Sequence, residues 1–198
     1  MKVWFIRHAQ SLANASSSFK ADDFSVPLVS LSPKGFKQAE ELINSFSEAP
    51  ELIITSSYVR TKQTAEPLIK KYPNVPQLEW PIQEFTYLSK GRCFGTTILE
   101  RRPWTEEYWQ KSNHLHLDGD GAERFVDFIS RAKDTIENLK NRKEDFVVLF
   151  SHEYFITAVK YLLEKKPNDI TSEKMREFRK YFLSNRVPNT SKIKFDFN

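Results

Sequence analysis

The sequence predicts an α/β fold, a three-layer α/β/α sandwich built on a mostly parallel central sheet. Three short runs rich in β-branched and aromatic residues, at residues 2–6, 52–55 and 146–150, have the composition of buried strands. Segments with apolar residues at helical spacing separate them, and this alternation is typical of a parallel sheet with helices on both faces. Residues 193–197 alternate apolar and polar side chains, so we expect a final edge strand that can run antiparallel.

The first half of the chain supplies a long loop, two helices and a third strand. Residues 9–31 are rich in serine, alanine and asparagine, which predicts a loop after the first strand. A helix is expected to begin at Ser32-Pro33, because serine caps helix N-termini and proline is favoured at the first helical position. Its apolar positions are Phe36, Ala39, Leu42, Ile43 and Phe46. The helix after residues 52–55 is expected to bury Val59, Thr64, Ala65, Leu68 and Ile69. A third strand is expected near 78–82, between two prolines.

Residues 85–120 interrupt the alternation of strands and helices. The stretch is rich in aromatic and basic side chains, so we expect a cap inserted over the carboxyl edge of the sheet, within one domain spanning residues 1–198. Asp120 and Glu123 resemble a capping box, which predicts that the next helix begins there. Its expected apolar face is Phe125, Phe128, Ile129, Ala132, Ile136 and Leu139. Two further helices are expected over 154–164 and 171–184.

The composition is that of a soluble globular protein, with 39% hydrophobic and 28% charged residues. The formal charge of +4 suits acidic ligands, but the basic residues are spread out and match no recognition motif, so we expect no nucleic-acid partner. No apolar stretch approaches the ~20 residues of a membrane span, so no membrane association is expected. Cys93 is the only cysteine, which excludes an internal disulfide and favours a reducing cytoplasm.

Two strand ends carry a histidine. Arg7-His8 directly follows the first strand, and His152 follows the fourth. Ligands of open α/β sheets bind at the carboxyl ends of strands, so we expect both imidazoles in one pocket. Arg60 lies in the first turn of the helix after the second strand, where the helix dipole and the guanidinium both attract an anion. Because a buried arginine is costly unless an anion pairs with it, the pocket is predicted to bind phosphate.

Motifs along nearly the whole chain resemble those of the histidine phosphatase superfamily, which has the phosphoglycerate mutase-like fold. They are Arg7-His8-Ala9-Gln10-Ser11 with Asn14, Leu31-Ser32-Pro33-Lys34-Gly35 with Gln38-Ala39, Ser56-Ser57 through Arg60-Thr61 and Gln63-Thr64-Ala65, Glu84, Ser151-His152, and Pro188-Asn189-Thr190-Ser191. Each match alone is weak. Their occurrence in the family's order argues against coincidence.

The resemblance implies a metal-independent phosphatase that hydrolyses phosphate monoesters and needs no cofactor. His8 would attack phosphorus as a neutral imidazole and form a phosphohistidine, with its other ring nitrogen held by an acceptor such as a backbone carbonyl. The residues implied to surround the transferring phosphoryl group are Arg7, Asn14, Arg60 and His152. Such a clamp stabilises the charge of a loose transition state. Glu84 would protonate the leaving oxygen and then activate water.

Three positions depart from the family pattern. Ala9 replaces the commoner glycine, Gln10 stands where glutamate is frequent, and Glu153 follows His152 where glycine is usual. A carboxylate at position 153 would repel phosphate if it faced the pocket, so we expect Glu153 to face away or to pair with a cation. This departure favours an unusual substrate or weakened activity. It keeps open a role in binding a phosphorylated ligand or a protein without turnover.

A mutase-type isomerase is the other alternative. Mutases of the family usually carry an Arg-His-Tyr-Gly run after the acid residue, whereas a different sequence follows Glu84. The Arg101-Arg102 pair in the expected cap points the other way, because it would suit a substrate carboxylate. We predict a phosphatase for a phosphorylated small molecule or a phosphoprotein. Aromatic cap residues would enclose the leaving group, and cap cations would bind a second anionic group. The sequence does not indicate whether the protein is a monomer or an oligomer.

One stretch imitates a metal site. Its residues of metal-binding type are His114, His116, Asp118 and Asp120. A hydrolase site of this kind would need a histidine at position 119, which is glycine, and a calcium loop would need an oxygen ligand at position 122, which is alanine. We therefore expect no metal here.

Overall fold

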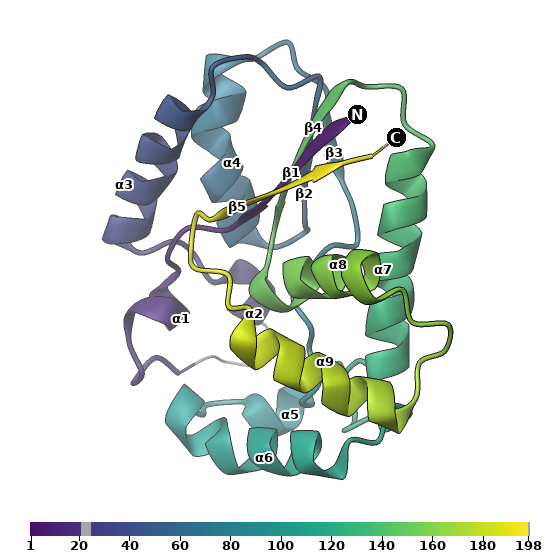
Figure 1. The fold of residues 1–198 in the computed structure, drawn as a ribbon. Coiled ribbons are helices and arrows are strands. Elements are labelled where there is room, and N and C mark those ends of the chain that lie inside the picture. The colour runs from purple at the N-terminus through teal and green to yellow at the C-terminus, as the bar shows by residue number, and fades with distance from the viewer. Residues whose placement is uncertain (21–24, 198) are drawn as a thin grey trace.

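The computed structural model describes residues 1–20 and 25–197 and contains a five-stranded sheet in the order β3-β2-β4-β1-β5. The strands are β1 (Lys2–Arg7), β2 (Leu52–Thr55), β3 (Gln77–Glu79), β4 (Phe146–Ser151) and β5 (Lys192–Asp196). Neighbouring strands are parallel except β5, which runs antiparallel to β1 at one edge. The predicted sheet, including its antiparallel edge strand, is confirmed (Figure 1).

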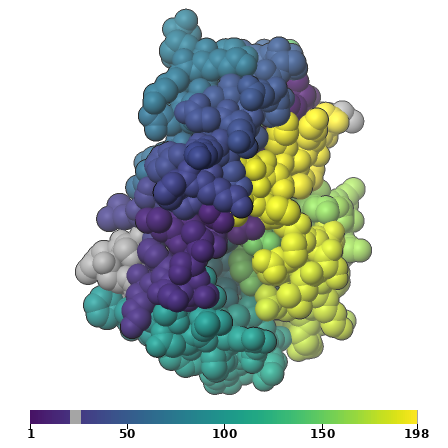
Figure 2. Space-filling view, turned by 90° about the vertical axis from the view of Figure 1, so that its left-hand side faces the viewer, coloured from purple at the N-terminus to yellow at the C-terminus, as the bar shows by residue number. Residues whose placement is uncertain are grey.

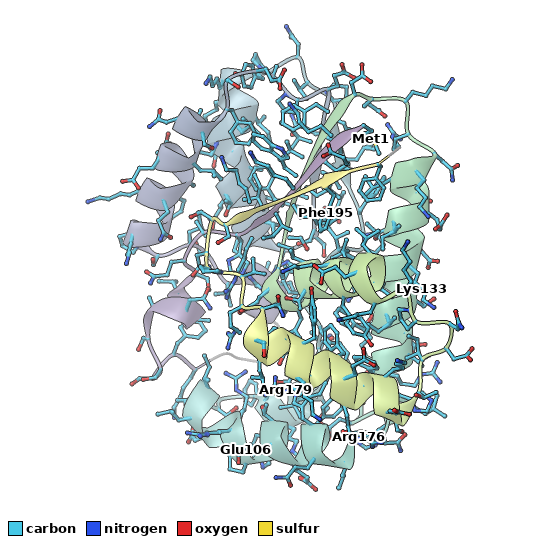
Figure 3. The ribbon with its side chains drawn as sticks, in the orientation of Figure 1. Met1, Glu106, Lys133, Arg176, Arg179 and Phe195 are labelled. Carbon is cyan, nitrogen blue, oxygen red and sulfur yellow. The ribbon has the colours of Figure 1, made fainter. Side chains whose placement is uncertain are left out.

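Helices cover both faces of the sheet, as a three-layer sandwich requires (Figure 1). One face carries α3 (Pro33–Leu42), the 3₁₀ turn η1 (Ile43–Ser45) and α4 (Val59–Lys71), and the other carries α7 (Phe125–Lys140), α8 (Glu153–Lys165) and α9 (Ser172–Ser184). Side chains alternate along each strand, so Trp4 and Ile6 pack toward α3 and α4, whereas Val3 and Phe5 pack toward α7 and α8. At the sheet edge, the rings of Phe5 and Phe195 lie 5.8 Å apart. Figure 3 labels Phe195 on β5.

Residues 85–120 lie beyond the ends of the central strands and contain α5 (Lys90–Cys93) and α6 (Ile98–Lys111), beside α9 (Figure 1). Thr97 and Glu100 form a reciprocal capping box at the start of α6. The stretch predicted as a loop after β1 holds two short helices, α1 (Leu12–Ala15) and α2 (Ser25–Leu28). Each has only four residues, which is too short for a periodic apolar pattern.

The predicted capping box at Asp120 is wrong. Gly119 and Gly121 have φ angles of +131° and +71°, so the chain turns there, and α7 begins at Phe125 without a side-chain cap. Glu123 instead accepts from Arg131 Nε at 2.8 Å. The third strand is also shorter than predicted and ends at Glu79.

Candidate active site

The three central strands bring their carboxyl ends to one place. His8 follows β1, Ser56 follows β2 and His152 follows β4, and these strands are adjacent in the sheet. The His8 backbone N–H donates to Ser151 O at 2.9 Å, which continues the β1–β4 pairing by one residue. The two imidazole rings lie 5.1 Å apart, and both are buried. The predicted meeting of the two histidines therefore occurs.

Arg60 joins the two imidazoles. It is the second residue of α4, and its Nε donates to His8 Nε2 at 3.2 Å while Nη2 donates to His152 Nδ1 at 3.1 Å. Its guanidinium also lies 4.6 Å from the centre of the Tyr58 ring. The fork geometry of arginine suits this double contact, which a single ammonium group would not reproduce.

The hydrogen bonds fix the protonation of each histidine. His8 Nδ1 lies 2.7 Å from Ala9 O, so Nδ1 carries the proton and Nε2 presents a lone pair. His152 accepts from Arg60 at Nδ1, so its Nε2 carries the proton and donates to Ser56 Oγ at 2.9 Å. Burial, and then the charge of Arg60, holds the pKa of both histidines well below the ordinary value. Both rings are therefore neutral.

A chain of hydroxyl groups continues from His152. Ser56 Oγ lies 2.9 Å from Thr61 Oγ1, and Thr61 Oγ1 donates to Tyr58 O at 2.7 Å. Ser56 is fully buried and also accepts from the Tyr58 backbone N–H at 3.2 Å. The sequence motif contained Ser56, but no role was predicted for it or for Tyr58. Its position at a strand end, next to two histidine-bearing strands, was the available signal.

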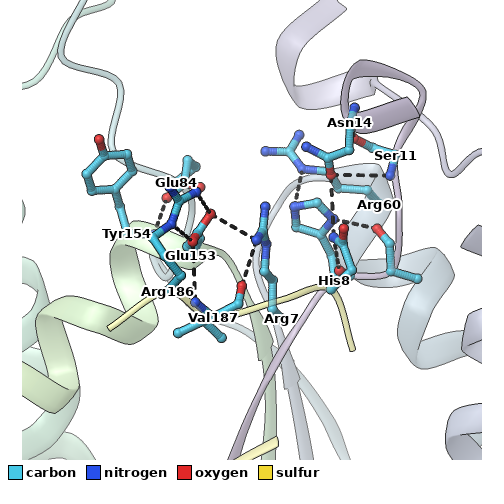
Figure 4. A network of polar contacts seen from close by, with 12 residues as sticks. Arg7, His8, Ser11, Asn14, Arg60, Glu84, Glu153, Tyr154, Arg186 and Val187 are labelled. Carbon is cyan, nitrogen blue, oxygen red and sulfur yellow. Dashed lines mark hydrogen bonds and ion pairs between the residues drawn. The ribbon is translucent and has the colours of Figure 1, made fainter. Parts of the chain in front are cut away.

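Arg7 lies beside His8, on the side that faces Glu153 (Figure 4). Its Nη1 donates to Val187 O at 2.6 Å and pairs with Glu153 Oε2 at 2.9 Å. Its Nε is buried and has no hydrogen-bond partner among the described residues, so it is a donor that a phosphate oxygen would satisfy. Glu153 pairs with cations, as expected, and its second partner is Arg186, whose Nε lies 2.5 Å from Oε1.

In Figure 4, Arg7 lies between Glu84 and His8. Its Oε1 accepts from the backbone N–H groups of Phe85 at 3.2 Å and Tyr154 at 3.0 Å. Burial raises the pKa of this carboxyl, and the charges of Arg7 and Arg60 oppose the rise. A carboxyl with a raised pKa is suited to donate a proton near neutral pH.

The segment that carries Glu84 is anchored from two elements. Arg131 on α7 donates through Nη1 to Pro81 O at 2.7 Å and to Gln83 O at 3.0 Å. Ser151, the last residue of β4, donates from Oγ to Ile82 O at 2.6 Å. Nothing in the sequence signalled Arg131, because its contacts are backbone carbonyls some 50 residues away.

Asn14 is exposed at the rim of the site. Its Oδ1 accepts from the Ser11 backbone N–H and from Asn189 Nδ2, both at 3.4 Å. Asn189 Nδ2 also donates to His8 O at 2.8 Å, which links Asn14 to the backbone beside the imidazole. The structure thus places Asn14 near His8 but without direct contact to its ring (Figure 4).

A cavity of about 480 Å³ extends from Arg60 and Glu84 to residues 85–120. Figure 2 shows a recess where the N-terminal segment, the C-terminal segment and the segment around residue 100 meet. The aromatic residues that line the cavity are Tyr58, Phe85, Tyr87 and Tyr154, and the cations that residues 85–120 contribute to it are Lys90 and Arg101. Arg102 is absent from the lining and pairs with Glu106 at the surface.

The stretch that imitates a metal site is used for other contacts. His114 Nδ1 lies 3.2 Å from Ser172 Oγ, and Asp118 pairs with Arg92 Nη1 at 2.8 Å. Among residues 1–20 and 25–197, no group of three or more His, Cys, Asp or Glu side chains is placed to hold a metal ion. No helix in these same ranges has both the length and the apolar content for a membrane span.

Residues 3–178 match the histidine phosphatase superfamily (branch 1), so the chain belongs to this family and the predicted resemblance is confirmed. The alpha-ribazole phosphatase of Shigella flexneri superposes with a TM-score of 0.72 at 19% identity over 100% of this chain and 91% of its own. A mycobacterial glucosyl-3-phosphoglycerate phosphatase gives 0.71 at 21% identity, over 98% of this chain and 88% of its own. The phosphoserine phosphatase of Entamoeba histolytica gives 0.72 at 19% identity, over 99% and 90%. No curated protein matches the sequence.

Proposed function

We propose that the protein is a phosphatase that hydrolyses a phosphate monoester through a phosphohistidine on His8. The observation that carries this proposal is the state of His8. It is a buried neutral imidazole, its Nδ1–H is held by Ala9 O, and its Nε2 lone pair faces Arg60. Membership of the histidine phosphatase superfamily supports a phosphatase activity of this kind. We also propose one domain over residues 1–198 with residues 85–120 as its cap, acting in a reducing cytoplasm.

In the first step, the Nε2 lone pair of His8 attacks phosphorus and the bond from phosphorus to the leaving oxygen breaks. Phosphoryl oxygens replace Nε2 as acceptors of the Arg60 Nε–H, and Arg7 Nε–H gains the acceptor that it lacks among the described residues. Asn14 would bind a remaining oxygen, and His152 would hold the Arg60 guanidinium in place through its Nδ1. Protonated Glu84 gives its proton to the leaving oxygen.

In the second step, water attacks the phosphohistidine. The Glu84 carboxylate takes a proton from this water, the nitrogen–phosphorus bond breaks, and its electron pair returns to His8 Nε2. Inorganic phosphate leaves, and both groups regain their starting protonation. Neither step requires a metal ion or a cofactor, because the arginine forks and neutral imidazoles supply the charge stabilisation.

The cavity favours a small substrate with a flat organic part and a second anionic group. Aromatic rings line its walls, and apart from Glu84 no carboxylate belongs to its described lining. Arg101 faces it with Nε and Nη2 fixed by Thr97 O at 3.1 Å and Thr96 O at 3.2 Å, so its charge is held in place. Arg101→Ala should therefore shift preference away from substrates with a second anion, in a panel of sugar phosphates, phosphoglycerates, nucleotides and phosphopeptides. Arg102→Ala is the matched control, and equal behaviour of the two variants would contradict the assignment.

The central experiment is turnover of p-nitrophenyl phosphate without added metal, in the parent and in His8→Ala. Turnover that the substitution abolishes supports the phosphatase. Equal and negligible rates would instead favour a protein that binds phosphorylated ligands. Phosphoglycerate isomerisation faster than hydrolysis would favour a mutase.

A further inference from the structure

The most unusual group beside the candidate active site is a buried carboxylate, that of Glu153. It is the first residue of α8, directly after His152, and is 5% exposed. Besides Arg7 and Arg186, its Oε1 accepts from the Val187 backbone N–H at 3.3 Å. Every contact of this carboxylate is with a donor, as its burial requires.

Two guanidinium groups share this one carboxylate. Arg186 is bidentate, with Nε at 2.5 Å from Oε1 and Nη2 at 3.0 Å from Oε2, and it also stacks on Phe182 with 4.8 Å to the ring centre. Its side chain is 57% exposed, whereas that of Arg7 is 13% exposed. Arg186 therefore offsets the charge of Glu153 from the solvent side, and Glu153 in turn faces Arg7 from the protein side.

The consequence for Arg7 is geometric. Its Nη1 is held by Val187 O and by Glu153, which turns the Nε side of the fork away from these partners. Without Glu153, the only acceptor left to Arg7 among the described residues would be Val187 O. The carboxylate thus fixes the orientation of a donor that the proposed mechanism uses.

Glu153 also lies among the charges that surround the proposed acid, Glu84. The charged and titratable groups that face Glu84 are Arg7, Tyr58, Arg60, Glu153, Tyr154 and Arg186. Burial is the largest cause of the raised pKa of Glu84. The three arginines favour its ionised form, and Glu153 adds to the effect of burial by favouring the protonated form. Glu153 therefore acts on both halves of the site.

We propose that Glu153 is a positioning residue that orients Arg7 for the phosphoryl oxygens and places a second carboxylate beside the general acid Glu84. This inference rests on the proposed phosphatase function. It turns the departure at position 153 into a working part of the site. The negative charge does not repel substrate, because Arg7 and Arg186 already pair with it.

Two substitutions separate the two effects. Glu153→Asp keeps the charge but withdraws the carboxylate by one methylene, so orthovanadate should bind about tenfold more weakly, as expected for a weakened charged hydrogen bond. In the pH profile of kcat/KM, the alkaline limb of this variant should stay at nearly the same pH as in the parent. Glu153→Gln keeps the size but removes the charge, so the alkaline limb should move to lower pH because Glu84 ionises earlier.

The pH profile is best measured with phenyl phosphate, by phosphate release, because phenoxide needs a proton more than p-nitrophenolate does. Glu164→Gln, an exposed carboxylate on the same helix, is the matched control, and thermal unfolding of each variant checks the fold. The proposal is overturned if folded Glu153→Asp binds orthovanadate within twofold of the parent, or if Glu153→Gln leaves the alkaline limb in place. Orthovanadate binding needs no turnover, so failure of the phosphatase function in the His8→Ala experiment would be recognised separately.

Discussion

Ser56→Ala tests whether the tautomer of His152 matters to the site. The substitution removes the only described acceptor of the His152 Nε2–H, at 2.9 Å, and an acceptor of the Tyr58 backbone N–H. A buried donor left without an acceptor costs about 1–3 kcal/mol. If His152 then moves its proton to Nδ1, that nitrogen meets the Arg60 Nη2–H as a second donor, and the link between Arg60 and His152 is lost.

The expected loss in kcat/KM follows from this cost. Since about 1.4 kcal/mol corresponds to a factor of ten, the loss should be about 5- to 150-fold if the transition state bears the whole cost. The assay is steady-state turnover of p-nitrophenyl phosphate, with urea unfolding to measure the accompanying loss of stability. Ser130→Ala, at an exposed position on α7, is the control. A folded Ser56→Ala variant with kcat/KM within twofold of the parent would refute the reasoning.

Three further predictions concern Arg60, the protonation of the two histidines and the independence of the activity from metal ions. Arg60→Lys should lower kcat for p-nitrophenyl phosphate about 100-fold, because one ammonium cannot serve both His8 Nε2 and His152 Nδ1, and a loss of less than threefold would contradict this. The pKa values of His8 and His152 are lowered in the folded state, so below the ordinary histidine pKa near 6.5 the unfolded chain binds more protons than the folded chain does. Urea titrations should therefore show the free energy of unfolding falling as the pH drops below that value, by at most about 1.4 kcal/mol per pH unit for each histidine. A free energy of unfolding that does not change with pH in this range would argue against neutral rings. Activity should survive dialysis against EDTA, whereas strong inhibition would bring the stretch from His114 to Asp120 back into question.

The sheet was predictable because its strands are short apolar runs with no helical periodicity. The helices of both faces were predictable because each has a continuous apolar stripe. The start of α7 was not, since Asp120 and Glu123 have the spacing of a capping box but Gly119 and Gly121 place the chain in a turn. The spacing of Asp120 and Glu123 is that of a helix start, but the backbone turn at the two glycines delays the helix to Phe125.

The central residues of the candidate site were predictable for a topological reason. Parallel strands end at the same edge, so residues that directly follow them must meet there, as His8 and His152 do. The partners of these residues were harder to predict. Glu153 was expected to find a cation, but Arg186 stands 33 positions away in a segment between α9 and β5, and no periodicity relates the two. Arg131 is similarly hidden, because its partners are backbone carbonyls.

Burial and the charges of the site together explain why its two histidines are neutral. Arg7 and Arg60 bring two fixed positive charges to a buried place, and a protonated imidazole between them would add a third. Neutral rings avoid that repulsion, and they also provide what phosphoryl transfer needs, a lone pair on His8. A bound phosphate dianion would then compensate the positive charges of the two arginines, and no protonated histidine would be needed to bind it. The same electrostatic arrangement therefore disfavours protonation of the proposed nucleophile and favours binding of the phosphoryl group that it would attack.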